Sequence, residues 1–430
     1  MFITASLDDQ LHAQRDDPLR ILIVGAGVAG TALAQLLRRR GLHPALVERT
    51  APGEHPGYML ALMPNADPVF RDLGSTALYR ERSVALRTFA FHSHRGRVLR
   101  RDPLGDLLSA HGDYRGIDRG TLLDVLTADG CTVTPGLTVA SCTPERGGRR
   151  VTLASAPAEG ADAPRSAVRA ERFDLVVGAD GIGSALRALL PVQPIERTRT
   201  GWGGWVLWSE DDEDPHTGDE LWGNGFFLGA YPVGGGTGSR RGVFLGGPAE
   251  IREKGAAVFA QRVRHGVPAP TPRLAAALDA AAADPSPYWW RLEDARAAAW
   301  TAPGAILLGD AAAAFLPTAG IGAAMALESA WTLSRVLPHA DRRTLPAVLA
   351  AWEQEQRPRV ESAQSNSRLL ARVMFRQGRL LTTVRETALR LASARAALGP
   401  IVRLMSARPE PAAMLTRAGI ALPAGGPGAV

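Results

Sequence analysis

The chain has 430 residues, of which 46% are hydrophobic and 21% charged, and it contains two cysteines. This composition is typical of a large globular protein of two or three interlocked domains. No apolar run is long enough to span a membrane, so we expect no transmembrane segment. Two cysteines are too few for a disulfide framework, and the N-terminus lacks the pattern of a secretory signal, so we expect a cytoplasmic protein.

The charge balance does not indicate a nucleic-acid-binding protein, although 49 basic residues exceed 43 acidic ones. Lys254 is the only lysine and tyrosines number five, so few groups titrate between neutrality and the pKa of arginine. A small excess of arginine therefore raises the isoelectric point steeply. No long basic run or aromatic-basic pattern accompanies it, and we expect no nucleic-acid partner.

The first regular pattern follows residues 1–17, which we expect to form a disordered or loosely docked N-terminal tail. Residues 19–24 are an apolar run, typical of a strand buried on both faces. Residues 31–40 have helical spacing with basic residues in the last turn. Residues 44–47 then form a second apolar strand, which ends at Glu48. This order predicts a strand–helix–strand unit.

Between the first strand and the helix, Gly25, Gly27 and Gly30 form a G-x-G-x-x-G loop. Glycines let the backbone approach a pyrophosphate at the helix N-terminus, where free N–H groups and the helix dipole favour negative charge. Glu48 is placed to accept hydrogen bonds from ribose hydroxyls. The unit predicts dinucleotide binding, and it fits FAD and NAD equally.

A second strand–glycine–helix pattern spans residues 173–190, FDLVVGADGIGSALRALL. The simplest interpretation is a strand–turn–helix capped by Asp180 or Ser184. That interpretation does not require the Gly-Ala-Asp-Gly sequence, the serine and Arg187 together.

A third pattern spans residues 307–330, LLGDAAAAFLPTAGIGAAMALESA. Asp310 is the only acid between a strand and a long run of small residues that leads, through Pro317, into a helix from about Ala323. Small residues let the backbone approach a large flat group. We therefore predict a bound planar cofactor.

With these three motifs in this order, the chain resembles the class A flavoprotein monooxygenases, the group typified by para-hydroxybenzoate hydroxylase, over roughly residues 20–360. Two weaker motifs agree: GIDRGTLLDVL, which contains Arg119, resembles an Arg-bearing helix start of the family, and WEQEQRPR, residues 352–359, resembles the helix after its flavin domain. The resemblance implies an α/β fold with a Rossmann-like FAD-binding domain of the GR2 type, an interleaved antiparallel β-sheet substrate domain and C-terminal helices.

The resemblance also implies the domain boundaries. The FAD-binding domain would comprise residues 18–82, 103–193 and 291–345, the substrate-binding sheet domain 83–102 and 194–290, and the C-terminal helical region 346–430.

The resemblance implies how the cofactor is held. The loop from Gly25 to Gly30 would hold the FAD pyrophosphate and Glu48 the adenosine ribose. Arg119 would reach the phosphate or the ribityl chain, unless it makes a surface salt bridge at a helix cap. The full set of expected cofactor-binding residues is Gly25, Gly27, Val28, Ala29, Gly30, Glu48, Arg49, Arg119, Asp180, Gly181, Asp310, Pro317, Gly320, Gly322 and Ala323.

Further roles follow from the same resemblance. Asp180 would bind through its backbone and shape a groove shared by FAD and the nicotinamide, while Arg187 would stabilise that loop. Asp310 would accept hydrogen bonds from the ribityl chain, and Pro317 would lie against the isoalloxazine ring. The backbone from Gly320 onward would run along the pyrimidine edge of the ring, where helix N–H groups stabilise the charge of reduced flavin.

The chain departs from the family pattern at three positions. Ala313 stands where histidine is common, Ala324 where asparagine is common and Ser329 where aspartate is frequent. Backbone contacts to FAD do not need these side chains, so we still expect FAD binding. Tuning of the flavin by side chains, and any proton relay through the missing histidine, stay open.

Short aromatic runs broken by glycine, between the second and third motifs, are typical of strands and turns. Core packing explains any single tryptophan there, but some aromatic residues should line an apolar substrate pocket. Our candidates are Trp208, Trp222 and Phe227, together with Pro317. They favour a bulky, largely uncharged substrate.

His92 and His94 alternate along a predicted strand. Arg95 and Arg97 flank them, so we expect both histidines on an exposed edge. A histidine pair also lacks the third ligand that zinc requires, so we expect no metal site.

By resemblance, the protein is an FAD-dependent NAD(P)H:oxygen oxidoreductase (EC 1.14.13-like) that forms a flavin hydroperoxide and hydroxylates a small aromatic, polycyclic or polyketide-type molecule with O2. Two alternatives stay open: epoxidation, N-oxidation or dehydrogenation on the same fold, or a flavin-binding protein without catalysis. The sequence names no catalytic residue. It leaves open NADH versus NADPH, and monomer versus homodimer.

Overall fold

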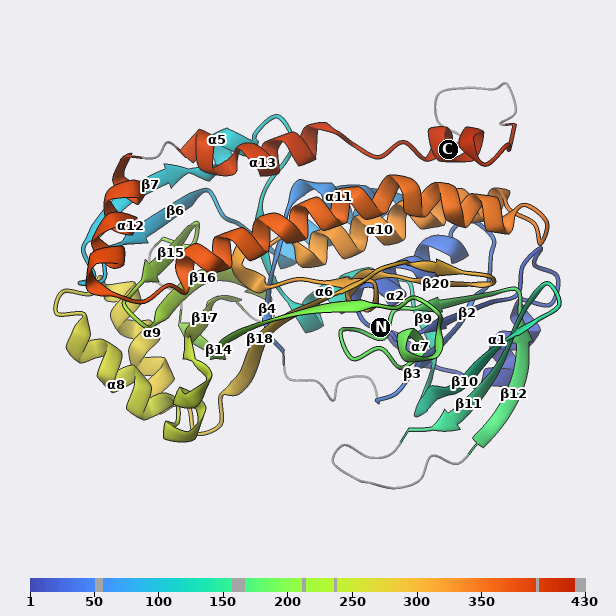
Figure 1. Cartoon of the computed structure of the whole chain (residues 1–430), viewed down its shortest axis with the longest axis horizontal. Helices are drawn as coiled ribbons and strands as arrows, with labels where there is room; N and C mark the ends of the chain where they lie inside the picture. The colour runs from blue at the N-terminus through green and yellow to red at the C-terminus, as the bar shows by residue number, and fades with distance from the viewer. Residues whose placement is uncertain (51–56, 157–166, 211–213, 236–237, 392–393, 422–430) are drawn as a thin grey trace.

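The computed structural model describes residues 1–50, 57–156, 167–210, 214–235, 238–391 and 394–421 (Figure 1). In this part of the chain the strands form a parallel sheet, a small antiparallel sheet and a large mixed sheet. The parallel and the large mixed sheets occupy opposite ends of the molecule, and α10 (Gly322–Val336) and α11 (Leu345–Met374) run lengthwise above them (Figure 1). The mixed α/β architecture expected from the sequence is confirmed.

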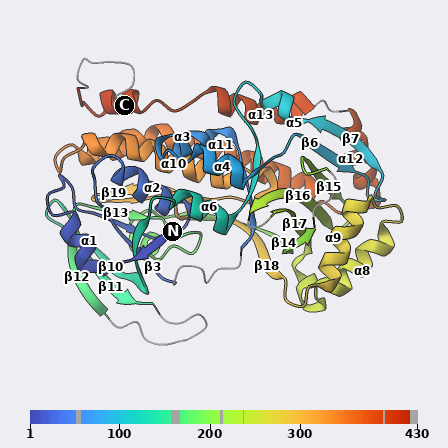
Figure 2. The same ribbon diagram turned by 180° about the vertical axis from the view of Figure 1, so that it is seen from behind.

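The parallel sheet carries the glycine motifs. β2 (Ile21–Val24) pairs in parallel with β3 (Ala45–Glu48) on one side and with β13 (Leu175–Gly178) on the other. Its order is β1 (Phe2–Thr4), β9 (Cys131–Pro135), β3, β2, β13, β20 (Ala305–Leu307) and β19 (Thr301–Ala302). Its edge strand β19 pairs with β20 in antiparallel, whereas the other neighbours are parallel. α2 (Val28–Arg38) and α10 pack against each other over this sheet (Figure 2). All four residues of β2 are buried, as the apolar run predicts.

The N-terminal segment is not the disordered or loosely docked tail that we expected of residues 1–17. β1 extends the parallel sheet through β9, and Ser6 caps α1 (Leu7–Ala13) in a reciprocal capping box with Asp9. The Gln10 side chain exchanges hydrogen bonds with the backbone of Leu46, at 2.9 Å each way. The prediction was wrong because the three residues of β1 are too few for periodicity to reveal.

The small sheet consists of β10 (Leu137–Glu145), β11 (Gly148–Ser155) and β12 (Ala167–Phe173). It is antiparallel and follows directly on β9 in the chain. The tip of the hairpin that we expected between β11 and β12 lies outside the described residues.

The large sheet combines strands from distant parts of the chain. Its strands in spatial order are β21 (Ala313–Ala314), β18 (Tyr288–Ala297), β14 (Ile195–Glu210), β17 (Gly238–Pro248), β16 (Phe227–Gly235), β15 (Thr217–Trp222), β6 (Thr88–His92) and β7 (Val98–Pro103), with β4 (Met59–Leu62), β5 (Val84–Ala85) and β8 (Arg115–Asp118) joined at the side. The sheet is mostly antiparallel, as expected, but β15 pairs with β6 in parallel. β16 also pairs with β8 in parallel. These parallel pairs arise because β6 and β8 come from an earlier segment of the chain and not from an adjacent hairpin.

The two faces of this sheet have different neighbours. α8 (Ala256–Gly266) and α9 (Pro272–Ala283) cover the outer face, where Trp205 and Leu221 join their apolar cluster (Figures 1 and 2). The opposite face, which we call the inner face, carries Trp202, Val206, Trp222, Phe227 and Phe244. These side chains share a cluster with Leu316, from the segment after β21, so the inner face is turned toward the third glycine motif.

His92 is not on an exposed edge, because β6 lies between β15 and β7. Its ring is fully buried and its Nε2 lies 2.7 Å from Asp219 Oδ1. His94 is about one-third exposed, and its Nδ1 lies 2.6 Å from Glu386 Oε1. Both histidines therefore have structural partners, and the part of the chain that the structure describes contains no cluster able to hold a metal ion.

The remaining elements connect and cover these sheets. The remaining α-helices are α3 (Asp67–Asp72), α4 (Thr76–Arg82), α5 (Leu104–Leu108), α6 (Arg119–Leu126), α7 (Ala185–Leu189), α12 (Arg379–Leu391), α13 (Ala394–Ser406) and α14 (Pro411–Arg417). Among the described residues, no helix combines the length and the hydropathy needed to cross a membrane.

Candidate functional site

The turns after β2, β13 and β20 lie side by side at the carboxyl edge of the parallel sheet. The Ala179 N–H donates to the Val24 carbonyl, and the Leu308 N–H donates to the Gly178 carbonyl, each at 2.8 Å. Because β2 has β3 on one side and β13 on the other, the strand order reverses here. Ligands of open α/β sheets bind at such a reversal. The fold therefore brings the three glycine motifs of the sequence together at one place.

The first turn is shaped by glycines. Gly25 has φ of +105°, in the region that favours glycine, and a Cβ on Gly30 would lie 2.0 Å from the Gly25 carbonyl oxygen. Gly27 differs, because no protein atom lies within 4 Å of its would-be Cβ. α2 starts directly after Gly27, and no side chain caps it. Val28, Ala29 and Gly30 in its first turn thus present N–H groups beside open space, which suits a phosphate.

Glu48 folds back toward this turn. Its Oε2 accepts a hydrogen bond from the Ala26 N–H at 2.6 Å, and its Oε1 accepts from the Arg49 N–H at 2.8 Å. The Arg49 side chain is exposed. Oε1 also accepts from the Thr50 N–H and hydroxyl, at 3.1 and 3.2 Å. Oε2, with its one hydrogen bond from Ala26, can accept another, so Glu48 fits a ribose hydroxyl at Oε2 while it rigidifies the turn.

The second turn combines both interpretations that the sequence offered. Ser184 caps α7 by accepting from the Arg187 N–H at 2.9 Å, and the Asp180 carboxylate accepts from the Ala185 N–H at 2.7 Å. Gly181 has φ of +79° and open space around its would-be Cβ. The Asp180 side chain therefore stabilises the turn itself. Only the backbone of Asp180 and Gly181 faces the open space.

Arg187 connects the second turn to the third. Its side chain is buried, and the guanidinium donates to the Ala311 carbonyl at 2.8 Å and to the Ile182 carbonyl. The expectation that Arg187 stabilises its loop is borne out by these bonds.

Asp310 lies where the third turn begins. Water reaches its side chain, but the dense protein around it raises the pKa of Asp310 to about 6, and Arg187 opposes that rise. Asp310 in turn helps to raise the pKa of Tyr58, whose burial is the main cause, while Arg119 lowers it.

Tyr58 and Arg119 also contact each other. The Arg119 N–H donates to the Tyr58 carbonyl at 3.0 Å, and the guanidinium carbon lies 5.8 Å from the centre of the ring. Asp310, Arg119 and Tyr58 thus lie close together, although they come from three distant segments. Sequence reasoning missed Tyr58, because nothing in its local pattern distinguishes it.

The third turn leads into α10 through Pro317–Ala319, a single 3₁₀ turn. Gly320 follows with φ of +57°, and its would-be Cβ would lie 2.2 Å from the Tyr114 hydroxyl. α10 begins at Gly322 and, like α2, has no side-chain cap. The N–H groups of Gly322 and Ala323 therefore add to the positive potential of the helix N-terminus.

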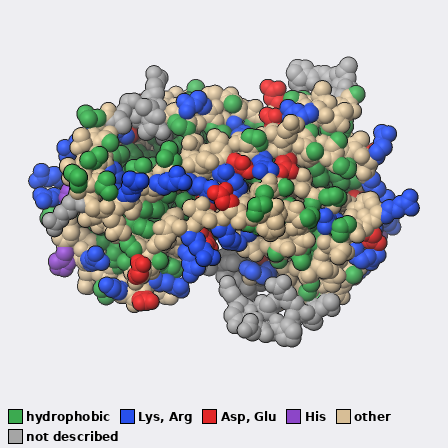
Figure 3. Space-filling view, viewed as in Figure 1, with side chains coloured by type: hydrophobic (Ala, Val, Ile, Leu, Met, Phe, Trp, Pro, Cys, Tyr) green, Lys and Arg blue, Asp and Glu red, His purple; other side chains and the backbone are tan. Residues whose placement is uncertain are grey.

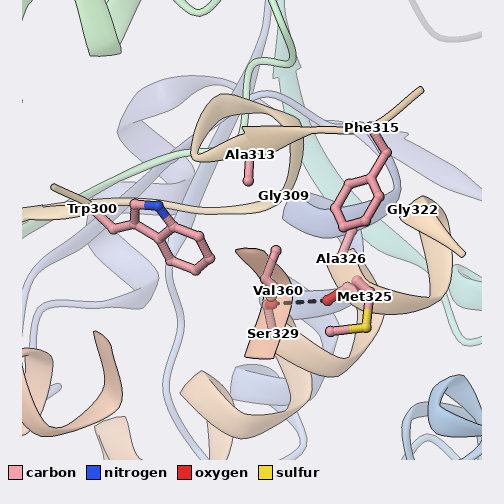
Figure 4. Close-up of a pocket in the computed structure, with 9 residues that line it drawn as sticks. All are labelled: Trp300, Gly309, Ala313, Phe315, Gly322, Met325, Ala326, Ser329 and Val360. Atoms are coloured by element: carbon pink, nitrogen blue, oxygen red, sulfur yellow. Dashed lines mark hydrogen bonds between the residues drawn. The ribbon is translucent and has the colours of Figure 1, made fainter. Parts of the chain in front are cut away.

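A small pocket beneath this turn contains two of the three departures from the family pattern. Ala313 and Ser329 line it together with Trp300, Phe315 and Val360 (Figure 4). The Ser329 hydroxyl donates to the Met325 carbonyl at 2.8 Å. None of the nine lining residues is titratable. Position 313 is alanine, and no other residue that lines this pocket can replace a histidine in a proton relay.

The WEQEQRPR motif on α11 has a structural role. Glu353 accepts hydrogen bonds from the Trp300 and Thr301 N–H groups at 2.8 and 3.1 Å. Arg359 makes two hydrogen bonds to buried Glu328 of α10, at 2.6 and 2.9 Å. The motif therefore fixes α11 against α10 and the sheet.

The three aromatic substrate candidates all lie on the inner face. Trp222 and Phe227 are buried, whereas half-buried Trp208 lies under the Arg240 guanidinium, 3.5 Å from its ring centre. Half-buried Pro317 lies next to Leu316 of the same cluster. Sequence reasoning missed the polar residues of this face, Glu220 and Tyr231, because an acid within a strand carries no motif.

Residues 19–367 match the family described as the FAD binding domain. The chain belongs to this family. FAD is therefore its cofactor, and the resemblance to the class A FAD-dependent monooxygenases is confirmed. The cradle at Gly27 and the charged groups around Asp310 fit that cofactor.

Relatives and solved structures agree with this assignment. The chain is 27% identical to an aurachin C monooxygenase/isomerase of Stigmatella aurantiaca over 87% of this chain and 94% of that one. It is 28% identical to a 2-heptyl-3-hydroxy-4(1H)-quinolone synthase of Pseudomonas aeruginosa over 83% and 89% of the two chains. Its fold matches that of Klebsiella pneumoniae HpxO complexed with FAD and uric acid, with a TM-score of 0.77 at 20% identity over 93% and 99% of the chains.

Proposed function

We propose that the protein transfers one oxygen atom from O2 to an aromatic or polyketide-type small molecule, with NADPH or NADH as the electron donor. In the balanced reaction, substrate, O2, NAD(P)H and a proton give hydroxylated substrate, NAD(P)⁺ and water. Bound FAD supplies the redox and oxygen chemistry. The observation that carries the proposal is the aromatic inner face, which clusters with Leu316 of the turn that carries Pro317 and Gly320.

The chain's own residues would bind FAD and orient it toward the substrate. The turn at Gly27 and the start of α2 would hold the pyrophosphate, and Glu48 the adenosine ribose. Asp310 would accept a hydrogen bond from the ribityl chain, with Arg119 beside the phosphates. The start of α10 would stabilise negative charge on the reduced flavin. Buried aromatic side chains of the inner face would exclude water from the substrate.

The substrate class rests on two observations. The inner face carries Trp202, Trp222, Phe227 and Phe244, which favour a flat apolar molecule. The relatives named above include an aurachin monooxygenase and a quinolone synthase, which fits an aromatic heterocycle.

Other expectations stay proposals. A cytoplasmic location is supported by Cys131 and Cys142, which are both free thiols. On the face shown in Figure 3, acidic side chains lie among the Lys and Arg side chains near the middle of the molecule. The expected lack of a nucleic-acid partner stays a proposal.

A visible spectrum and a turnover assay test the proposal. We expect a flavin spectrum and NAD(P)H oxidation that accelerates with an aromatic substrate and gives a product heavier by one oxygen atom. A product that has lost two hydrogens would favour the alternative of dehydrogenation. A flavin-loaded protein that no aromatic compound stimulates would favour the non-catalytic alternative.

A further inference from the structure

Glu220 lies on β15 with its side chain turned to the inner face. The residue before it, Asp219, is turned to the outer face, where Arg273 of α9 donates to its Oδ2 at 2.6 Å. Neighbouring side chains of a strand alternate between faces. Glu220 and Trp222 therefore share the inner face with Phe227 and Phe244.

Two neutral groups fix the Glu220 carboxylate. The Tyr231 hydroxyl donates to Oε1 at 2.7 Å, and the Trp222 indole N–H donates to Oε2 at 2.8 Å. Burial raises the pKa of Glu220, whereas Tyr231 and Trp222 lower it; no cation is among the causes of the shift. Each oxygen accepts one of these hydrogen bonds and can accept another. The residue is half-buried and not enclosed.

Buried Tyr114 lies between the Glu220 carboxylate and the flavin turn. The charge of Glu220 helps to raise the pKa of Tyr114, and a Cβ on Gly320 would lie 2.2 Å from the Tyr114 hydroxyl. Gly320 belongs to the turn expected to follow the edge of the flavin ring. Glu220 is thus an oriented acceptor on an otherwise aromatic surface, on the side of the sheet that faces the cofactor.

We propose that Glu220 is the positioning and specificity residue of the substrate site, and that it selects neutral aromatic molecules with an N–H or O–H donor on the ring. This inference rests on the proposed function. A donor on the substrate would add a hydrogen bond to those from Tyr231 and Trp222, whereas a substrate without a donor would desolvate the carboxylate and leave its remaining acceptor capacity unused. A substrate carboxylate at this place would be repelled, because two like charges would share one poorly solvated site.

The test uses matched probes that differ in this one feature. One set is 4(1H)-quinolone, its N-methyl derivative and 4-oxo-1H-quinoline-2-carboxylate, and the other is 2-naphthol, 2-methoxynaphthalene and 3-hydroxy-2-naphthoate. Binding to the FAD-loaded protein is measured from the change in flavin absorption, without NAD(P)H. We expect the donor-bearing parent of at least one set to bind roughly 10- to 100-fold more tightly than its methylated partner, the range for a hydrogen bond to a charged group.

Two variants assign this preference to Glu220. Glu220→Leu should bring the affinity for the parent down to that for the methylated probe. Glu220→Gln keeps an acceptor but removes the charge, so it should bind the carboxylated probe more tightly than the wild type does. The control is Glu250→Gln, which makes the same change at an exposed position of the 3₁₀ helix after β17 (Ala249–Lys254) and should leave all affinities unchanged. FAD content and circular dichroism establish that each variant is folded, and Glu220→Gln carries the test if Glu220→Leu loses FAD.

Equal affinity for parent and methylated probes, no binding of either parent, or an unchanged preference in both variants would overturn the assignment. The two proposals can fail separately. A wild type that oxygenates an aromatic compound without any preference for donors overturns the role of Glu220 alone. A wild type that shows the preference but transfers no oxygen overturns the proposed function alone.

Discussion

Replacing Arg187 with methionine should separate the second and third turns of the cofactor site. Arg187 is 2% exposed, and its guanidinium bonds the Ala311 carbonyl at 2.8 Å and the Ile182 carbonyl. Methionine retains the apolar stem but leaves these carbonyls without their donor. Each of these two hydrogen bonds from a charged group contributes about 1.5–3 kcal/mol, and relief from burying the charge offsets part of their sum, so we expect the free energy of unfolding to fall by about 2–4 kcal/mol.

Because the lost bonds hold the turns that frame FAD, we also expect the FAD affinity to fall by about 10- to 100-fold. FAD binding is measured by quenching of flavin fluorescence, and stability by thermal unfolding of the apoprotein. The matched control is Arg199→Met on β14, because that side chain is 74% exposed and its ion pair with Glu293 is 3.7 Å long. A variant with normal FAD affinity and stability, but weakened binding of substrate or nicotinamide, would refute a structural role for Arg187.

Three further predictions follow. Asp310→Asn should weaken FAD binding by about 10-fold, because a ribityl hydroxyl would lose a charged acceptor, as flavin fluorescence titration would detect; unchanged affinity would contradict this role. The pKa of Asp67 is raised to about 6, mainly by burial, so the stability that this group contributes is present below its ordinary pKa and is lost as the pH rises through about 6. Asp67→Asn should therefore melt at a higher temperature than the wild type at about pH 8 but not at about pH 4; a constant difference would contradict the assigned pKa. Gly204→Ala would place a Cβ 2.5 Å from the Phe244 ring, so calorimetry should show a loss of about 1–3 kcal/mol, whereas Gly266→Ala, with nothing within 4 Å, should change little. Equal stabilities of these two variants would contradict the packing of the inner face.

The cofactor side of the molecule could be predicted from the sequence because its elements are determined by residues close together in the chain. The apolar run before Gly25, the glycines and Glu48 lie within one short segment, so β2, α2 and β3 appear close to the expected positions. Contacts between distant segments were harder to predict. That Arg187 reaches the carbonyl of Ala311 follows only from the parallel pairing of β13 with β20.

The substrate side could be predicted only in part. Glycine-broken aromatic runs indicated strands, and Trp222 and Phe227 do share a face. Which face a strand residue occupies depends on its register, however, so the sequence could not separate Glu220 from Asp219. The pairing of β6 with β15 joins residues far apart in the chain, which is why His92 was expected at an edge and is buried.

The central claim is that this FAD-binding protein is a monooxygenase. The most direct test is turnover under ¹⁸O2 with NADPH or NADH and an aromatic substrate found by flavin titration, followed by mass spectrometry of the product. We predict one atom of ¹⁸O in each product molecule and one NAD(P)H consumed for each O2 in coupled turnover. A product without the label, or one whose new oxygen comes from water, would contradict it.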